Sequence, residues 1–193
     1  MLGEALILCI FSSAMNETTL HDLLQAAWSE SHGDWDVHEL VIHRKLMELP
    51  LVDLVDFTVI QTNRSRFAFT PLLLNAAFMV WDGALGNDGF LDFTDNLSVI
   101  PNDLFLAIVA DADRVIEVPA LWSPCEKHFW NLPAKVFDQQ KRLKAGTYRL
   151  RDYLPPDDPP ADLWTRLKGH PNRETAQTML PRLYARFGKS AFA

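Results

Sequence analysis

The stretch from residue 81 to residue 90 gathers three glycines, an asparagine and two aspartates, and loops rich in such oxygen ligands bind calcium in many proteins. An EF-hand loop that began at Asp82 would need oxygen ligands at its third and fifth positions, glycine at the sixth and glutamate at the twelfth. The sequence has other residues at these four positions: Ala84, Gly86, Asn87 and Phe93. It therefore predicts a tight corner between two helices and no metal site here.

Other residues that could ligate a metal or perform catalysis are too few or poorly spaced. Cys125 and His128 are one helical turn apart, but a stable zinc site needs three or four ligands, so we interpret this pair as incidental. His32, His38 and His43 do not align on one helical face and are predicted to be surface histidines. The sequence contains no GxSxG, GxxxxGK[ST], GxGxxG or HExxH motif. We therefore predict a protein without enzyme activity, metal or cofactor.

Charge is divided unevenly along the 193 residues, whose formal net charge is -7. Residues 1–120 contain 18 acidic and 5 basic side chains, whereas residues 121–193 contain 7 acidic and 13 basic ones. Such a split indicates two halves that attract each other or two surfaces for different partners.

Basic side chains cluster between residues 135 and 151, with two aromatic residues among them, and such a mixture can bind a phosphate backbone. The pI of about 5.3 argues against direct binding to nucleic acid. We expect these cations to neutralise the acidic half, either within the fold or across a homodimer. The cluster comprises Lys135, Lys141, Arg142, Lys144, Arg149 and Arg151.

The elements that must position these residues are helices throughout, so the predicted class is all-α in a single compact multi-helix domain. Thr18 or Thr19 is expected to cap a first helix that buries Leu20 and Leu24. In a second helix over 34–47, Val37, Leu40, Val41 and Leu46 are expected to face inward, and His38, Glu39, Arg44 and Lys45 outward. Further helices are predicted over 50–61, 70–83, 103–118, 123–130 and 134–144.

The predicted domain covers residues 15–154. Residues 1–14 have an apolar run without the basic residues of a secretory signal and too short for a membrane span, so they are expected to be an upstream extension of a cytoplasmic protein. Four prolines in residues 155–160 predict an extended spacer. Two helices over 161–168 and 173–187, the second kinked at Pro181, are expected to pack on the same domain.

The corner at residues 86–89 is expected to join two buried helices. Asn87 or Asp88 could cap the second helix, and Gly89 is expected to take a positive φ so that Phe90 can enter the core. Phe93 and Leu97 then continue the same apolar face.

The sequence from residue 86 to residue 96, GNDGFLDFTDN, resembles the Asn-Gly-Gly-Phe signature of the DNA mimic protein C-terminal domain family, in which an aromatic residue and an asparagine follow. The matching residues are Asn87, Gly89, Phe90, Phe93 and Asn96. Asp88 stands in place of the usual middle glycine. The resemblance covers residues 50–118 and does not extend to the C-terminal third.

The resemblance implies a helical, non-enzymatic protein whose acidic surface occupies the nucleic-acid site of a DNA-binding partner. A mimic needs ordered carboxylates, because duplex DNA carries about one charge per 1.7 Å of axis. Asp88, Asp92 and Asp95 would share one helical face, and Asp53 with Asp56 could form a second row. Mimicry requires that these carboxylates be exposed and free of basic partners.

Two other functions remain open at this point. An immunity or antitoxin-like protein that binds a toxin would also be a small acidic helical binder. A nucleic-acid binder would use the basic stretch 135–151. In every case but the last the partner is a protein.

Overall fold

The computed structural model describes residues 15–122, 129–143, 149–154 and 163–193. These residues form helices and no strand, so the predicted all-α class is confirmed. The predicted extension at residues 1–14 and the spacer at residues 155–160 lie outside them, as do Cys125 and His128.

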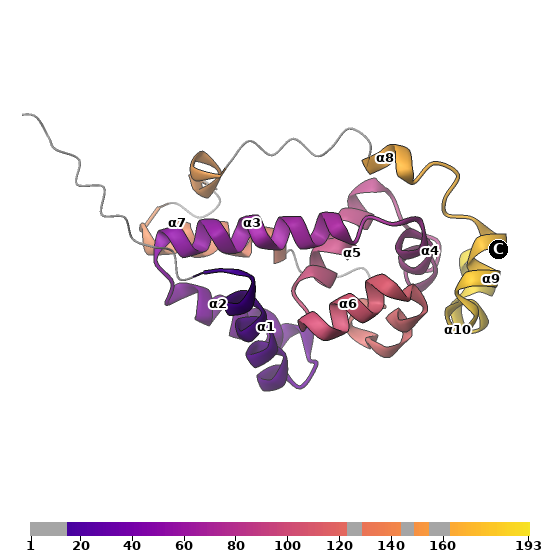
Figure 1. Cartoon of the computed structure of the whole chain (residues 1–193), viewed down its shortest axis with the longest axis horizontal. Coiled ribbons are helices and arrows are strands. Elements are labelled where there is room, and N and C mark those ends of the chain that lie inside the picture. The colour runs from indigo at the N-terminus through magenta and orange to yellow at the C-terminus, as the bar shows by residue number, and fades with distance from the viewer. Residues whose placement is uncertain (1–14, 123–128, 144–148, 155–162) are drawn as a thin grey trace, which may run out of the picture.

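The first half of the chain contains the longer helices. They are α1 (Glu17–Ser31), α2 (Trp35–Met47), α3 (Leu51–Phe67), α4 (Pro71–Val80), α5 (Asn87–Ser98) and α6 (Asn102–Ala110). In Figure 1, α3 runs along the molecule, with α1 and α2 beside one end and α4, α5 and α6 at the other. The long α3 therefore connects two groups of helices.

The rest of the described chain is built from shorter turns of helix. After the 3-10 turns Ala112–Glu117, Pro119–Leu121 and Phe129–Asn131 come α7 (Leu132–Gln140) and a further 3-10 turn, Arg149–Tyr153. The C-terminal part contains α8 (Leu163–Arg166), α9 (Arg173–Met179), α10 (Pro181–Leu183), a π turn (Tyr184–Gly188) and α11 (Lys189–Ala191).

Local sequence signals set most helix starts. The Asp34 side chain accepts the Val37 N–H at the start of α2, and Thr70 accepts the Leu73 N–H at the start of α4, which has Pro71 as its first residue. Helix α1 differs from the prediction because Asn16, and not Thr18 or Thr19, provides the cap. The helix therefore begins two or three residues earlier than predicted.

Two predicted helices are interrupted. Helix α6 ends at Ala110, because the extended Asp111 (φ -141°) begins a separate 3-10 turn and accepts the Asp113 N–H. The helix predicted over 173–187 stops at Met179, since the residue before Pro181 is pushed out of the helical region and Leu180 has φ -130° and ψ 56°. The expected kink is therefore a break.

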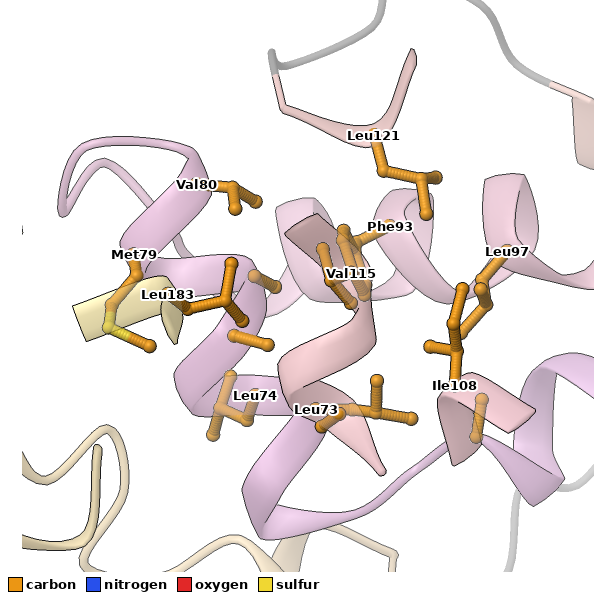
Figure 2. Close-up of a cluster of buried hydrophobic side chains, with 14 of the residues drawn as sticks. Leu73, Leu74, Met79, Val80, Phe93, Leu97, Ile108, Val115, Leu121 and Leu183 are labelled. Carbon is orange, nitrogen blue, oxygen red and sulfur yellow. The ribbon is translucent and has the colours of Figure 1, made fainter. Parts of the chain in front are cut away.

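The buried apolar side chains form two clusters. One lies among α1, α2, α3 and α7, and the other among α4, α5, α6 and the C-terminal helices. Figure 2 shows the second cluster, in which Leu73 and Leu74 of α4 lie near Val115 and Phe93, and Leu183 lies near Val80. Trp35 packs against both clusters, so the two groups of helices form one continuous interior.

Two buried polar side chains attach the C-terminal segment. Asn75 of α4 accepts the Asn172 N–H at 2.7 Å and lies 3.0 Å from His170 Nδ1. Asp113 accepts the N–H groups of Arg182 and Leu183 at 3.0 and 2.8 Å, so it caps the chain after Leu180. These bonds span 69 to 97 residues, and they hold α9 and α10 against α4.

Candidate protein-binding surface

The predicted corner turns earlier than the sequence indicates. Helix α4 ends at Val80, and the chain reverses at Asp82 (φ 53°) and Gly83 (φ 78°). A Cβ atom on Gly83 would lie 2.8 Å from the Ala191 carbonyl oxygen. Gly83 therefore supplies both the left-handed backbone and the space for the C-terminal helix.

Gly89 does not take the predicted positive φ, since it is the third residue of α5 and has a helical backbone. A Cβ atom at this position would lie 3.2 Å from both Leu85 Cδ1 and Trp81 Cζ3. Trp81 cannot move freely because its indole N–H donates to the Leu121 carbonyl oxygen at 3.0 Å. Glycine is thus required for close packing of α5 on Trp81, and not for the turn.

The predicted cap of α5 is also wrong. The N-cap is Gly86, which has no side chain, and Asn87 and Asp88 are already inside the first turn and cannot cap it. Both side chains are exposed. Phe90 and Phe93 enter the core as predicted, each with no exposed surface.

Asn96, the last residue of the motif, is buried in α5. Its Oδ1 atom accepts no hydrogen bond within the part of the chain that the structure describes. Gly86, Asn87 and Phe90 line a cavity of about 270 Å³ together with residues of the C-terminal segment, among them His170. The first part of the motif and the C-terminal segment therefore face the same cavity.

The first predicted acidic row is not a continuous exposed surface. Asp88 is exposed, whereas Asp92 and Asp95 are both half-buried. Burial raises the pKa of Asp95 to about 6, against a hydrogen bond with Ser65 that lowers it. The reason is that α5 packs closely on α3, so the Asp95 side of the row faces protein.

The second predicted row is also broken. Asp53 is 4% exposed, and its Oδ1 atom accepts the Met15 N–H at 3.2 Å. Asp56 is half-buried. The condition that these carboxylates be exposed therefore fails for Asp53, and the half-buried Asp56, Asp92 and Asp95 meet it only in part.

Within the basic stretch 135–151, Lys135, Lys141 and Arg142 are exposed, while Lys144 and the Arg149 side chain lie outside the described residues. Arg151 is exposed and engaged in an interaction within the fold. An ion pair that does join the acidic and basic halves comes from a later residue, Arg182, whose Nη1 atom lies 3.0 Å from Glu117 Oε1.

Helix α2 presents an apolar stripe to solvent, which reverses part of the prediction. Leu40 is 69% exposed, Val37 39% and Met47 38%. Arg44, also on the exposed side, pairs with Glu30 of α1 at 2.7 Å. The four side chains follow the spacing i, i+3, i+7 and i+10, so they form one face, which we call the α2 face.

The inward position of His38 explains this rotation of α2. Its Nε2 atom lies 3.0 Å from the Val99 carbonyl oxygen, and its ring stacks on Trp35 with centroids 5.2 Å apart. The Trp28 ring meets it edge-on at 5.2 Å. Burial lowers the pKa of His38. The helical pattern was judged from apolar residues, and histidine was treated as polar. The sequence therefore did not predict that His38 would be buried.

Among the described residues, no helix combines the length and the apolar composition that crossing a bilayer requires. No protein-family model, curated protein or solved structure matches the chain. The resemblance to the DNA mimic family stays a prediction.

Proposed function

We propose that this protein is a non-enzymatic binding protein that recognises a partner protein through the α2 face. The observation that carries the proposal is the 69% exposure of Leu40, a large apolar side chain on a helix that is otherwise anchored in the core. Contiguous exposed apolar side chains on a folded protein mark interaction sites.

The spacing of the residues on the α2 face indicates what kind of surface would pack on it. Val37, Leu40, Arg44 and Met47 follow the alternation of three and four residues by which one helix packs along another. The partner is therefore expected to present an apolar helix face. Charged residues adjoin the apolar members of the α2 face: Arg44, within the face, pairs with the exposed Glu30, and Glu48 follows Met47 in the chain. Such charges favour specificity over affinity.

The proposal does not depend on the acidic-surface hypothesis. Asp53 is buried and Asp95 is half-buried, so we do not base the proposal on a row of carboxylates that imitates DNA. A DNA-binding regulator and a toxin both stay within the proposal as proteins that could carry the matching helix. A cytoplasmic location is part of the same proposal.

A comparison of two variants tests the α2 face. Leu40→Glu places a charge in its centre, while Met179→Glu makes the same change at a 54%-exposed methionine on α9. The full chain is immobilised, and proteins retained from native lysate are quantified by mass spectrometry. We expect a protein that wild type and Met179→Glu retain and that Leu40→Glu binds at least tenfold more weakly, which corresponds to about 1.4 kcal/mol.

The same variants distinguish a second copy of the chain from another partner. If wild type and Met179→Glu sediment as dimers and Leu40→Glu as a monomer, the α2 face binds a second copy. Equal retention by all three proteins, together with equal sedimentation, would show that the α2 face is only a solvated helix surface.

A further inference from the structure

A cavity of about 490 Å³ lies between α1, α3 and α6, away from the α2 face. Glu17 and His21 of α1 line one side, and Arg64 and Phe67 of α3 line another. This volume is within the range of sites that hold small molecules.

Arg64 places a positive charge in the cavity wall. Arg64 is buried, with 8% of the residue exposed to solvent. The guanidinium donates to the carbonyl oxygens of Ser98 and Ile100 at 2.9 and 3.1 Å and to Asn102 Oδ1 at 2.9 Å. These bonds use three of its five N–H groups, so one donor on each terminal nitrogen has no acceptor among the residues that the structure describes.

Within residues 15–122, 129–143, 149–154 and 163–193, no ion pair balances the charge of Arg64. All three of its hydrogen-bond acceptors are neutral, and in the described ranges no carboxylate lies within 4.0 Å of the guanidinium. Glu17 acts on it only from a distance, and burial lowers the pKa of Arg64 to about 10. Since a buried charge is normally paired, an anion at this position would complete the site.

Apolar side chains surround this charge. The guanidinium carbon lies 4.2 Å from the centre of the Phe105 ring, which covers one face of the cation. Phe67 and Leu106, both on the cavity lining, are 61% and 47% exposed. A ligand that entered here would cover both side chains.

We propose that this cavity binds a small-molecule carboxylate with an apolar body, held by its carboxylate at Arg64 and by its body against Phe67 and Leu106. The planar fork of two remaining N–H groups matches the two oxygens of a carboxylate. The acidic Glu17 on the lining and Asp103 in the first turn of α6 disfavour a more highly charged anion such as a phosphate ester. The proposal is independent of the α2 face.

The first experiment measures binding to the full wild-type chain by calorimetry and NMR. The probes are 3-phenylpropanoate, its neutral amide 3-phenylpropanamide, phenyl phosphate and acetate. We expect 3-phenylpropanoate to bind at least tenfold more tightly than the other three, with the largest NMR shifts at Arg64, Phe67 and Leu106. Equal binding of the amide, or tighter binding of phenyl phosphate or acetate, would overturn the assignment.

Substitutions at the exposed lining test the site without disturbing the core. Phe67→Ser is expected to weaken 3-phenylpropanoate binding at least fivefold, while Met179→Ser, at an equally exposed position outside the cavity, leaves it unchanged. Glu17→Gln removes the nearest competing carboxylate and should tighten binding two- to fivefold. An unchanged affinity in both Phe67→Ser and Glu17→Gln would place the probe elsewhere.

Two further measurements complete the test. Arg64→Gln should abolish binding if it folds, and its folding is checked by circular dichroism because Arg64 also holds the α5–α6 connection. If Arg64→Gln does not fold, the Phe67→Ser and Glu17→Gln results decide.

A peptide with a C-terminal phenylalanine that binds tenfold more tightly than 3-phenylpropanoate would overturn the small-molecule assignment in favour of a protein C-terminus.

Discussion

Asp95 shows how an acid that the sequence places on the surface becomes partly enclosed by the fold. Burial against α3 raises its pKa to about 6, from 3.8 for the free side chain. The folded state therefore binds a proton more tightly than the unfolded state does. Between about pH 4 and pH 6 the stability contribution of this group falls as pH rises, and above pH 6 the folded chain carries a buried charge.

We expect Asp95→Asn to stabilise the protein at pH 7.5 by about 1 to 3 kcal/mol, because an amide occupies the same space without the charge. At pH 4 the difference from wild type should nearly vanish. Urea unfolding at both values of pH measures it, and Asp88→Asn, at the exposed end of the same row, serves as the control. A gain that is the same at pH 4 and pH 7.5 would contradict the pKa argument.

Gly89 is a second residue at which the structure differs from the prediction. The neighbouring Leu85 and Trp81 side chains, and not a positive φ, exclude larger residues from this position. Gly89→Val should destabilise the fold by about 1 to 3 kcal/mol, because its extra carbons meet Trp81, which a hydrogen bond holds in place. Gly89→Ala should cost less than the valine variant, since helix propensity offsets part of the contact. Thermal unfolding compares the two. A valine variant as stable as wild type would show that Trp81 moves aside.

Helix starts provide a prediction at the scale of the element. Gly86 caps α5 with the extended backbone that an N-cap needs (φ -93°), and a Cβ atom there would meet nothing within 4 Å. Gly86→Ser should therefore stabilise α5 by a few tenths of a kcal/mol, because the hydroxyl can accept an N–H of the first turn. Chemical denaturation measures the change.

Removing the capping side chain of α4 is the matched control for adding one to α5. Thr70 already accepts the Leu73 N–H at 3.2 Å, so Thr70→Ala should cost about 1 kcal/mol. If both variants changed stability in the same direction, capping would not be the property that distinguishes these two helix starts.

At the scale of the whole molecule, Asp113 attaches the C-terminal helices to the rest of the fold. Asp113→Ala leaves the buried Leu183 N–H and the part-buried Arg182 N–H without their acceptor, and we expect a loss of about 1 to 3 kcal/mol and faster amide hydrogen exchange over residues 180–192. The comparison is Glu117→Gln, which breaks solvent-screened ion pairs to Arg114 and Arg182 and should destabilise the protein less than Asp113→Ala does. Unchanged exchange in Asp113→Ala would show that apolar packing alone holds this segment.

The sequence by itself determined the helical class and many of the helix boundaries. Those features depend on neighbours within a few residues: Thr70 and Pro71 begin α4, and the spacing of Phe90 and Phe93 turns one side of α5 inward. Capping and 3.6-residue periodicity act within one or two turns, so they can be read before the chain is folded.

Tertiary structure alone decided which side chains reach solvent. His38 is buried because the Val99 carbonyl oxygen, 61 residues away, accepts its hydrogen bond. With His38 turned inward, α2 is rotated so that Leu40 is exposed. Arg64 is buried because the α5–α6 connection offers it carbonyl oxygens 34 and 36 residues further along the chain. Helical periodicity places residues on a common face but does not say which face meets the core when polar groups find distant partners. The α2 face and the Arg64 cavity both follow from such contacts.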